Sequence, residues 1–406
     1  MKEGWNIEKM GEVMLIARGG SPRPIKKYLT DSPDGFNWIK ISDATASDKY
    51  IYNTKQKITE EGLHKTRLVE EGDFILSNSM SFGRPYIMKT KGCIHDGWLV
   101  LKEKEKNILD KDFLYHLLGS PYIFKEFDRL AAGSTVRNLN ISLVSSVLIP
   151  IPPLPEQKAI VKILDKAFAK IDQAKANIEK NIENAKELLV SYMQDEFSNN
   201  VDGKNSESLN DICELIVDCE HKTAPTQETG YPSIRTPNIG FGKLILENVN
   251  LVSEETYNKW TRRAIPLPGD LILAREAPAG NIGEIPENTF VCLGQRTVLI
   301  RPKKDKFISK YLAYLILSKN VQEKLLSHSQ GATVGHINMR DIRAFKIYNL
   351  PKVSSQEKIV ASINRILKEV EKIKSTYDNE IDNLEELKKS LLQKAFAGEL
   401  IKMSEP

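Results

Sequence analysis

The chain has 406 residues, of which 41% are hydrophobic and 28% charged, and its net charge is +4. This length suits two or more domains, and the composition is that of a globular protein rather than a disordered or fibrous one. No run of about 18 apolar residues is present, which argues against a membrane span.

The N-terminal residues and the cysteines show no pattern of a signal peptide, a disulfide framework or a metal site. The first residues, MKEGWNIEKMGEV, lack the apolar centre of a signal peptide. The four cysteines are scattered, without a Cys-x-x-Cys pair. We therefore expect neither a disulfide framework nor a zinc site, and this cysteine usage favours a reducing cytoplasm. The mildly basic charge permits phosphate contacts without proving them.

Internal repetition is the clearest feature of the sequence. Five segments recur in the same order, each about 200 positions later. They are IEKMGEV (7–13) with LNDICEL (209–215), GFNWIKISD (35–43) with GYPSIRTPN (230–238), EGDFILSNSMSFG (71–83) with PGDLILAREAPAG (268–280), GSTVRNLN (133–140) with GATVGHIN (331–338), and EQKAIVKIL (156–164) with SQEKIVASI (355–363). The order and the spacing predict two copies of one unit.

Each copy begins with a mixed domain and ends with a long helix. Short apolar runs predict buried strands at 73–79, 97–103, 270–276 and 296–302. Helices are predicted at 111–131 and 308–326, the first interrupted at Gly119-Ser120-Pro121. The expected boundaries are 1–152 for the first domain, 153–198 for the first long helix, 199–350 for the second domain, 351–400 for the second long helix and 401–406 for a tail.

Proline-containing breakers separate the domains from the helices. IPIPPLPEQ (149–157) cannot continue a helix or a central strand, because proline lacks an N–H and fixes φ. In the second copy NLPKVSSQ (349–356) takes this role, with Ser354 or Ser355 as the expected N-cap.

Both long helices carry a heptad stripe. Apolar residues recur every seven positions for about five heptads without an interior glycine or proline, which is typical of a coiled coil. The stripe residues are Leu164, Ile171, Ile178, Ala185 and Tyr192 in the first helix and Ile363, Val370, Tyr377, Leu384 and Leu391 in the second, with Leu188 and Leu189 among the flanking positions. Antiparallel pairing within the chain is the interpretation we favour. Packing of each helix on its own domain and a homodimer of coils are the alternatives.

Familiar catalytic patterns are missing from the sequence. It contains no phosphate-binding loop, no Gly-x-Gly-x-x-Gly after a strand, no Asn-Pro-Pro-Tyr/Phe tetrapeptide, no Gly-x-Ser-x-Gly elbow and no His-x-x-x-His pair. A nuclease cluster could be imagined from Asp73 or Asp270 with Glu276. Both aspartates follow a glycine in a turn that enters a strand, which explains them structurally. We expect no catalytic residue and no metal site.

The repeat, the two long helices and several strings resemble the specificity (S) subunits of type I restriction-modification systems. The strings are GDFIL (72–76) and GDLIL (269–273), GST (133–135) and GAT (331–333) with Asn140 and Asn338 downstream, IPIPPLPEQ (149–157) and LLQKAFAGEL (391–400). The resemblance covers nearly the whole chain. The second copy departs from the family pattern in having NLPKVSSQ instead of the proline-rich run.

The resemblance implies an α+β fold of two similar target-recognition domains joined by two long antiparallel coiled-coil helices with pseudo-two-fold symmetry. It further implies that each domain reads one half of a bipartite, asymmetric site on double-stranded DNA. The helices would set the gap and recruit two methyltransferase (M) subunits, and restriction (R) subunits would join them. S-adenosylmethionine, ATP and Mg would belong to those partners, with no cofactor in this chain.

Polar residues of the loops are the candidate DNA contacts, because arginine can bind guanine and asparagine adenine through paired hydrogen bonds. In the first domain they are Arg18, Ser21, Arg23, Lys40, Ser42, Asp43, Asn78, Ser79, Arg84, Ser134, Arg137 and Asn138. In the second they are His221, Lys222, Arg235, Asn238, Arg275, Asn281, Thr333, His336, Asn338 and Arg340. Two alternatives stay open at this point: a specificity subunit of another restriction class, and a coiled-coil scaffold that binds only proteins.

Overall fold

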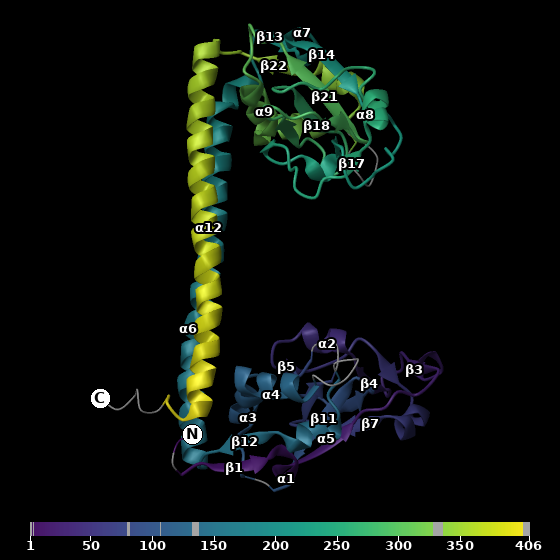
Figure 1. Cartoon of the computed structure of the whole chain (residues 1–406), viewed down its shortest axis with the longest axis vertical. Helices are drawn as coiled ribbons and strands as arrows, with labels where there is room; N and C mark the ends of the chain where they lie inside the picture. Colours follow the sequence, from purple (N-terminus) through teal and green to yellow (C-terminus); the bar gives the residue numbers. More distant parts are fainter. Residues whose placement is uncertain are drawn as a thin grey trace, which may run out of the picture. The chain divides into compact units, whose positions relative to one another are not determined.

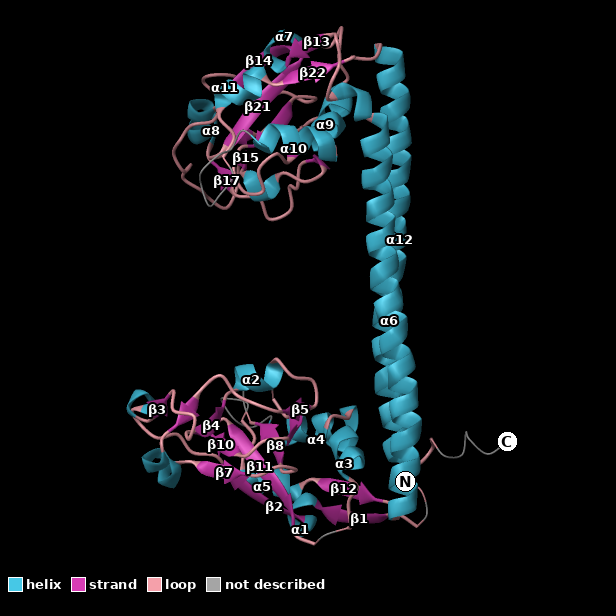
Figure 2. Ribbon diagram, turned by 180° about the vertical axis from the view of Figure 1, so that it is seen from behind, coloured by secondary structure: helices cyan, strands magenta, loops and turns pink. Residues whose placement is uncertain are grey.

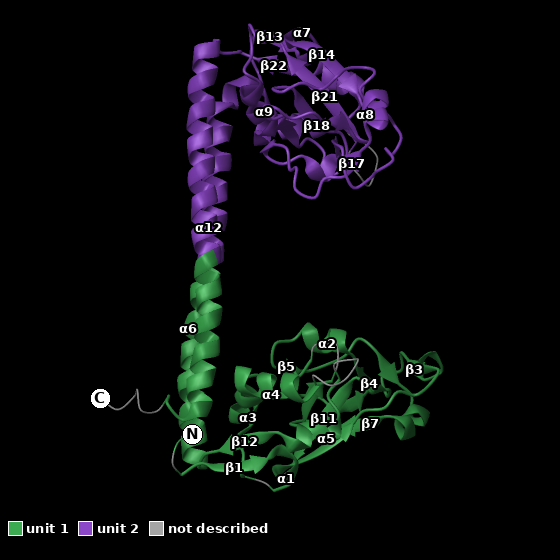
Figure 3. Cartoon of the chain, in the orientation of Figure 1, with its two compact units in different colours: residues 1–177, 379–406 green, residues 178–378 purple. Residues whose placement is uncertain are grey.

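The computed structural model describes residues 2, 4–78, 82–105, 107–131, 138–327 and 336–400. They form two compact units, one of residues 1–177 with 379–406 and one of residues 178–378 (Figure 3). Each unit holds one mixed domain and a stretch of each long helix, α6 (Leu154–Glu196) and α12 (Val353–Ala397) (Figure 1).

The domain of the first unit contains two five-stranded sheets and a two-stranded ribbon, with strand orders β2-β11-β8-β9-β5, β3-β6-β4-β10-β7 and β1-β12 (Figure 2). The strands are β1 Asn6–Lys9, β2 Met14–Arg18, β3 Leu29–Thr30, β4 Phe36–Ile39, β5 Tyr50–Ile51, β6 Lys57–Ile58, β7 Arg67–Val69, β8 Phe74–Ser77, β9 Pro85–Met88, β10 Gly92–Ile94, β11 Trp98–Glu103 and β12 Leu148–Ile151. The helices are α1 Met10–Val13, η1 Ile25–Lys27, α2 Ile41–Thr45, η2 Glu60–Lys65, α3 Lys111–Leu118, α4 Pro121–Ala131 and α5 Ile141–Ser146.

The domain of the second unit has the same five-stranded central sheet and two-stranded ribbon, but its other sheet has three strands instead of five. The strand orders are β14-β21-β18-β19-β16, β17-β15-β20 and β13-β22. The strands are β13 Ser206–Ser208, β14 Cys213–Asp218, β15 Tyr231–Ile234, β16 Gly242–Lys243, β17 Leu251–Val252, β18 Leu271–Ala274, β19 Ile282–Glu284, β20 Cys292–Leu293, β21 Thr297–Pro302 and β22 Lys346–Tyr348. The helices are η3 Ser198–Asn200, α7 Leu209–Ile212, η4 Thr236–Asn238, α8 Glu254–Trp260, α9 Ser309–Leu317, α10 Lys319–Ser327 and α11 Met339–Ala344.

The central sheets of the two domains match strand for strand. The four predicted strands are β8, β11, β18 and β21, and every residue of β8 and β18 is buried. Leu99 faces Arg18 across β11 and β2, and Val298 faces Asp218 across β21 and β14. The same register therefore places the end of β2 and the end of β14 at equivalent positions.

Three details predicted from the sequence were wrong. Met10, not Ile7, occupies the position of Leu209: each begins the first short helix, and its amide donates to a distant carbonyl, that of Val147 or Phe345. Apolar residues recur every third position in both strings, so the alignment can slide by three positions without an obvious loss of similarity.

The segment 308–326, predicted as one helix, forms two helices, α9 and α10, which meet at Ser318. The buried Ser318 hydroxyl donates to the carbonyl of Leu315 at 2.7 Å, as that of Ser120 does to Leu117 at 2.6 Å in the first copy. Only in the first copy is the serine at this break flanked by glycine and proline, so only there did the sequence predict the break. Helix α12 begins at Val353, so Ser354 and Ser355 lie in its first turn rather than at its N-cap.

The long helices run antiparallel to each other within each unit. In the first unit Lys388 Nζ lies 3.6 Å from Asp172 Oδ1, and Lys175 forms an ion pair with Glu385. In the second unit Asn181 Nδ2 lies 3.3 Å from the Tyr377 hydroxyl. Residue numbers thus rise along α6 while they fall along α12.

The stripe residues meet a core that includes the neighbouring domain. Leu164 and Ile171 are buried in the core of the first unit, with Leu384 and Leu391 packed against it. In the second unit Ile363 is buried and Tyr192, Ile366 and Leu367 pack around it. Each helix therefore packs both on its partner helix and on a domain. Leu188, expected beside the stripe, is 67% exposed, while Leu189 is buried.

A buried glutamine joins each domain to its helix. Gln157 accepts from the amide of Asp110 at 2.7 Å and donates to the carbonyls of Ile108 and Pro152. Gln356 repeats these three bonds with the amide of Ile308 and the carbonyls of Lys306 and Pro351. The breakers before both helices thus share one hydrogen-bonded geometry, although their sequences differ.

A second polar pair at this junction differs between the copies. His116 Nε2 lies 2.8 Å from Asp165 Oδ1 in the first unit, and the Tyr314 hydroxyl donates to Asn364 Oδ1 at 2.6 Å in the second. Burial lowers the pKa of His116 and outweighs the opposing effect of the Asp165 carboxylate. The first junction therefore contains a histidine whose pKa lies below its usual range, whereas the second has no histidine in this position.

None of the described helices is both long enough and apolar enough to cross a membrane. All four cysteines are buried and unpaired with one another.

Candidate nucleic-acid interface

A polar turn before β11 gathers several of the predicted residues of the first domain. The carbonyl oxygen of Asp96 accepts from Asn78 Nδ2 at 2.8 Å and from Arg18 Nε at 2.9 Å. The Ser21 hydroxyl donates to Asp96 Oδ1 at 2.5 Å. The segment at the end of β2 and the residue that follows β8 are thereby tied to one aspartate at the end of the central sheet.

The electrostatics of this turn favour an ionised carboxylate. The hydrogen bond from Ser21 lowers the pKa of Asp96, against the opposing effect of partial burial. The Arg23 guanidinium lies 3.7 Å from Asp96 Oδ2 and its side chain is 83% exposed. Next to it, His95 Nδ1 accepts from the amide of Gly97 at 2.9 Å, and burial lowers the pKa of His95. The turn therefore presents a carboxylate, an exposed arginine and a neutral imidazole.

The matching end of the central sheet in the second domain is organised around a buried arginine, Arg275, which directly follows β18. Arg275 is 7% exposed. Its NH1 donates to Asp218 Oδ2 at 2.7 Å, and its Nε donates to the carbonyl of Ile337 at 2.9 Å. Its NH2 lies 2.9 Å from His336 Nε2. Every nitrogen of this guanidinium has a partner inside the domain.

The chain of contacts continues outward to the surface. Because Arg275 can only donate, His336 Nε2 accepts, so the imidazole proton sits on Nδ1 and points to Glu276 Oε1 at 3.2 Å. Glu276 Oε2 in turn lies 2.8 Å from Arg296 Nε. These residues line a cleft of ≈ 230 Å³ together with His221 and Gln295.

Four positions are equivalent in the two clusters. The amide of Asn78 donates to the carbonyl of Gly97 at 3.0 Å, and that of Arg275 donates to the carbonyl of Arg296 at 2.8 Å. With the strand register, this pairs the following residues: Arg18 with Asp218, Asn78 with Arg275, Asp96 with Gln295 and Gly97 with Arg296. The backbone is shared, and all four side chains differ in charge or in size.

A family model for the type I restriction modification DNA specificity domain matches residues 2–184 and 202–383. The chain belongs to this family. The identity expected from the sequence, a specificity subunit that recognises DNA sequence, is thus confirmed, and both copies are matched. Nothing in these matches favours the protein-only scaffold.

The relatives cover nearly the full chain. The type I restriction enzyme MjaVIII specificity subunit of Methanocaldococcus jannaschii is 23% identical over 421 residues, 98% of this chain and 93% of that protein. The EcoBI specificity subunit of Escherichia coli is 22% identical over 423 residues, 98% and 86%.

Solved structures share the fold. A chain described under "Structural basis underlying complex assembly and conformational transition of the type I R-M system" matches with a TM-score of 0.73 and 20% identity, covering 98% of this chain and 99% of that one. The HsdS subunit of Thermoanaerobacter tengcongensis matches with a TM-score of 0.55 and 21% identity, covering 98% of both. The expected α+β class with a tandem repeat is confirmed.

Seven of the predicted contact residues meet in the two clusters. They are Arg18, Ser21, Arg23 and Asn78 in the first and His221, Arg275 and His336 in the second. The sequence analysis missed their central partners, Asp96, Asp218, Glu276, Gln295 and Arg296. The available signal was positional: in both copies a short polar turn directly precedes the strongest predicted strand.

Two of the predicted residues, Asp43 and Asn238, accept hydrogen bonds from backbone amides three residues earlier, those of the predicted Lys40 and Arg235. Asp43 Oδ2 accepts from the amide of Lys40 at 3.0 Å, and Asn238 Oδ1 accepts from the amide of Arg235 at 3.1 Å. Each bond caps the first turn of α2 or η4, so Asp43 and Asn238 stabilise these turns. Asn281 Nδ2 donates to the carbonyl of Ile239 at 3.2 Å and has a similar internal role.

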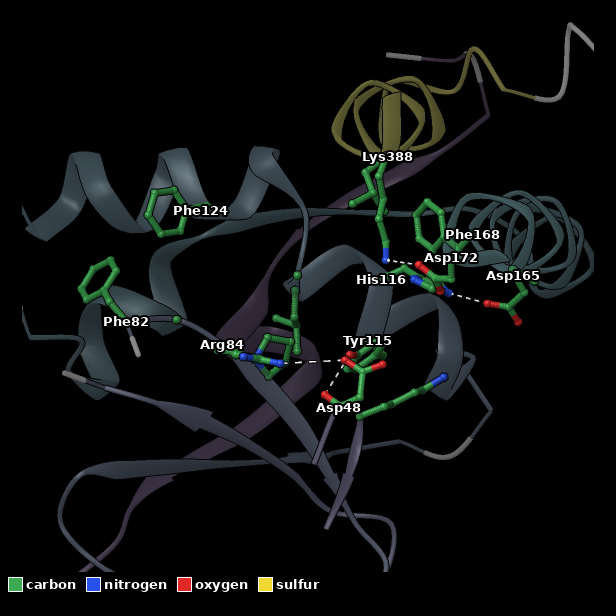
Figure 4. A pocket seen from close by; sticks show the side chains of 17 residues that line it. Asp48, Phe82, Arg84, Tyr115, His116, Phe124, Asp165, Phe168, Asp172 and Lys388 are labelled. Carbon is green, nitrogen blue, oxygen red and sulfur yellow. Dashed lines mark hydrogen bonds and ion pairs between the residues drawn. The ribbon is translucent and has the colours of Figure 1, made fainter. Parts of the chain in front are cut away.

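Arg84 belongs to a different place in the first unit. It lines a cavity of ≈ 590 Å³ with α3, α4 and the two long helices, and its NH2 lies 3.8 Å from Asp48 Oδ1 (Figure 4). Its guanidinium also lies over the Tyr86 ring, 5.3 Å from the ring centre. No hydrogen bond or ion pair between described residues connects Arg84 to the Asp96 turn.

The remaining candidates are not joined to either cluster by a contact between described residues. Ser42, Lys222, Asn338 and Arg340 are exposed, and Asn138 is half-buried. Ser79, Ser134, Arg137 and Thr333 lie outside the described residues. Whether these residues touch DNA stays a prediction.

One group of potential metal ligands exists among the described residues. Ligand atoms of Asp218, Cys219 and His221 lie within 4.8 Å of one another. Asp218 Oδ2 already accepts from Arg275, and burial raises the pKa of the Cys219 thiol, which disfavours the thiolate that would bind a metal. The ion pair with Arg275 explains the position of the Asp218 carboxylate without a metal ion.

Proposed function

We propose that the two domains read two different halves of a bipartite DNA site. The observation that carries the proposal is the difference between the two clusters on one shared backbone. Base edges in the major groove are distinguished by their pattern of hydrogen-bond donors and acceptors. The first cluster offers Arg18, Arg23 and the Asp96 carboxylate, and the second offers His221, Gln295 and Arg296. Different chemistry at equivalent positions supports an asymmetric site.

The long helices would act as the spacer between the two halves. α6 has 43 residues and α12 has 45, which corresponds to roughly 65 Å of helix at 1.5 Å per residue. The apolar stripe stabilises both helices as a pair. The gap in the DNA site should therefore be constant in length and free in sequence.

The chain would supply recognition, and partner subunits would supply the chemistry. We propose two methyltransferase subunits that carry S-adenosylmethionine, and restriction subunits that use ATP and Mg. Support comes from the family match and from the absence of familiar catalytic motifs in the sequence. A structural match described in terms of complex assembly in a type I system points in the same direction.

Methylome sequencing of cells that express this chain with its methyltransferase subunit tests the proposal. We expect a gapped adenine-methylation motif whose two halves differ in sequence. An ungapped palindrome, or no motif in the presence of a stable complex, would contradict it.

The Arg23→Ala variant tests the role of the first cluster. Because Arg23 is exposed beside Asp96, its loss should change which first-half sequences are modified. Lys26→Ala, an exposed cation three residues later, is the matched control. If Arg23→Ala instead weakens binding equally for all DNA sequences, Arg23 contacts phosphate rather than a base.

A further inference from the structure

Resting on the proposed function, we propose that Arg296 binds a guanine in the second half-site and that Glu276 is its positioning residue. Neither residue belongs to the DNA contacts expected from the sequence. Both come together only through the fold, from the turns after β18 and before β21.

Arg296 has the exposure and the free donors that a base-reading arginine needs. Its side chain is 62% exposed and borders the polar cleft of the second domain. Its Nε lies 2.8 Å from Glu276 Oε2, which forms an ion pair with the guanidinium. Among the described residues no other acceptor engages the guanidinium, so both terminal amino groups stay available. Two parallel N–H donors match O6 and N7 of guanine in the major groove.

Glu276 is itself held in place by a series of contacts that ends in the domain interior. His336 donates to its other carboxylate oxygen, and Arg275 donates to His336. Arg275 is anchored by Asp218 and by the carbonyl of Ile337. A guanidinium aligned before binding loses less side-chain entropy when it meets the base. This series makes Arg275 a support for the reading residue rather than a reader.

The first domain has no counterpart of this arginine. The position equivalent to Arg296 is Gly97, and the position equivalent to Gln295 is Asp96. An aspartate there offers acceptors only, which suits the exocyclic amino group of cytosine rather than guanine. The guanine requirement at this position should therefore apply to the second half-site alone.

The test uses the complex of the full chain with its methyltransferase subunit. Competitive binding is measured with duplexes in which each base pair of the second half-site is replaced in turn, and the methylome is sequenced for each variant. For Arg296→Ala we expect discrimination at one guanine to fall by about 10- to 100-fold, the range set by one bidentate pair. Arg296→Lys should retain binding but lose part of this discrimination, since one ammonium on a flexible stem replaces the planar fork of two aligned amino groups.

Glu276→Gln should relax the same base position to a smaller degree, because the side chain keeps its shape and loses its charge. Lys304→Ala is the matched control: it removes an exposed cation just beyond the other end of β21 and should leave the motif unchanged. Melting curves should not change for Arg296→Ala, since the side chain is exposed.

Three results would overturn the inference alone. These are a bipartite motif without guanine in the second half, an unchanged motif with Arg296→Ala, and a loss of affinity that is equal for all sequences. An ungapped or absent motif for the unaltered complex would instead reject the proposed function and the inference with it.

Discussion

The turn before β11 and the turn before β21 have the same place and the same backbone bonds but opposite electrostatic designs. In the first, an aspartate at the centre accepts from an arginine, a serine and an asparagine. In the second, the buried Arg275, which reaches this turn from the end of β18, donates to an aspartate, a histidine and a carbonyl. The comparison teaches that the sheet and the backbone bonds carry the fold, so the side chains of the turn can diverge without a change of architecture.

The shared frame should be equally sensitive in both copies. Leu164 and Ile363 are 0% exposed at equivalent points of the two long helices. Leu164→Ala and Ile363→Ala should each lower the free energy of unfolding by about 3 kcal/mol through lost burial and a residual cavity. Urea unfolding measures this, and Leu188→Ala, at an exposed site, should stay within about 0.5 kcal/mol. A large loss of stability for only one of the two variants would show that the two helix positions are not equivalent.

Substitution of Arg275 and of Asn78, which occupy equivalent sites after β18 and β8, should lower stability by different amounts. Arg275→Ala leaves the half-buried Asp218 without its arginine partner. It should cost about 2 to 3 kcal/mol, less than a fully buried pair, because water and His221 still reach Asp218. Asn78→Ala, at the equivalent site, removes one hydrogen bond and should cost about 1 kcal/mol. Thermal melts of both variants compare them. Similar losses would argue against a buried arginine as the organiser of the second turn.

The glutamines at the two junctions offer a finer comparison. Gln157→Ala and Gln356→Ala each remove three hydrogen bonds and leave an amide and two carbonyls to be satisfied by water. We expect a loss of about 2 kcal/mol for each. Chemical unfolding of the two variants side by side would reveal any difference. A neutral result at Gln356 would mean that the changed breaker of the second copy uses another anchor.

The smallest expected effect is on the pH dependence of stability. Burial keeps the pKa of His116 below its usual 6.5, so the folded chain binds fewer protons at this site than the unfolded chain. The stability from this site is therefore complete above the unfolded pKa and is lost as the pH falls from about 6.5 through the lower pKa of the folded chain. Asp165 opposes the shift, Asp112 and Lys49 also face the ring, and the burial effect is the largest.

The double variant His116→Tyr with Asp165→Asn copies the Tyr314–Asn364 pair of the second unit. It should flatten the decline of the melting temperature between roughly pH 7 and pH 5. Melts over this range, with Asp165→Asn alone as the control, test the idea. An undiminished decline in the double variant would show that other groups cause it.

The chain order of the amino acids by itself determined the repeat, the central strands and the long helices. β8, β11, β18 and β21 are short apolar runs between turn residues, and the stripe of α6 and α12 follows a seven-residue period. Such patterns reflect local preference and burial, and these act over a few residues. Where local signals were weak, as at Ser318 and at the start of α12, the sequence analysis missed the break and misplaced the cap.

Only the tertiary structure decided which polar side chains meet. Arg275 and Asp218 are 57 residues apart, and Arg84 turned out to face the long helices rather than the Asp96 turn. Asp96, Glu276 and Arg296 gained their roles from partners in distant loops. The physical reason is that an ion pair or a hydrogen bond depends on positions within a few tenths of an ångström. Those positions are set by how strands from distant parts of the chain align in the sheet.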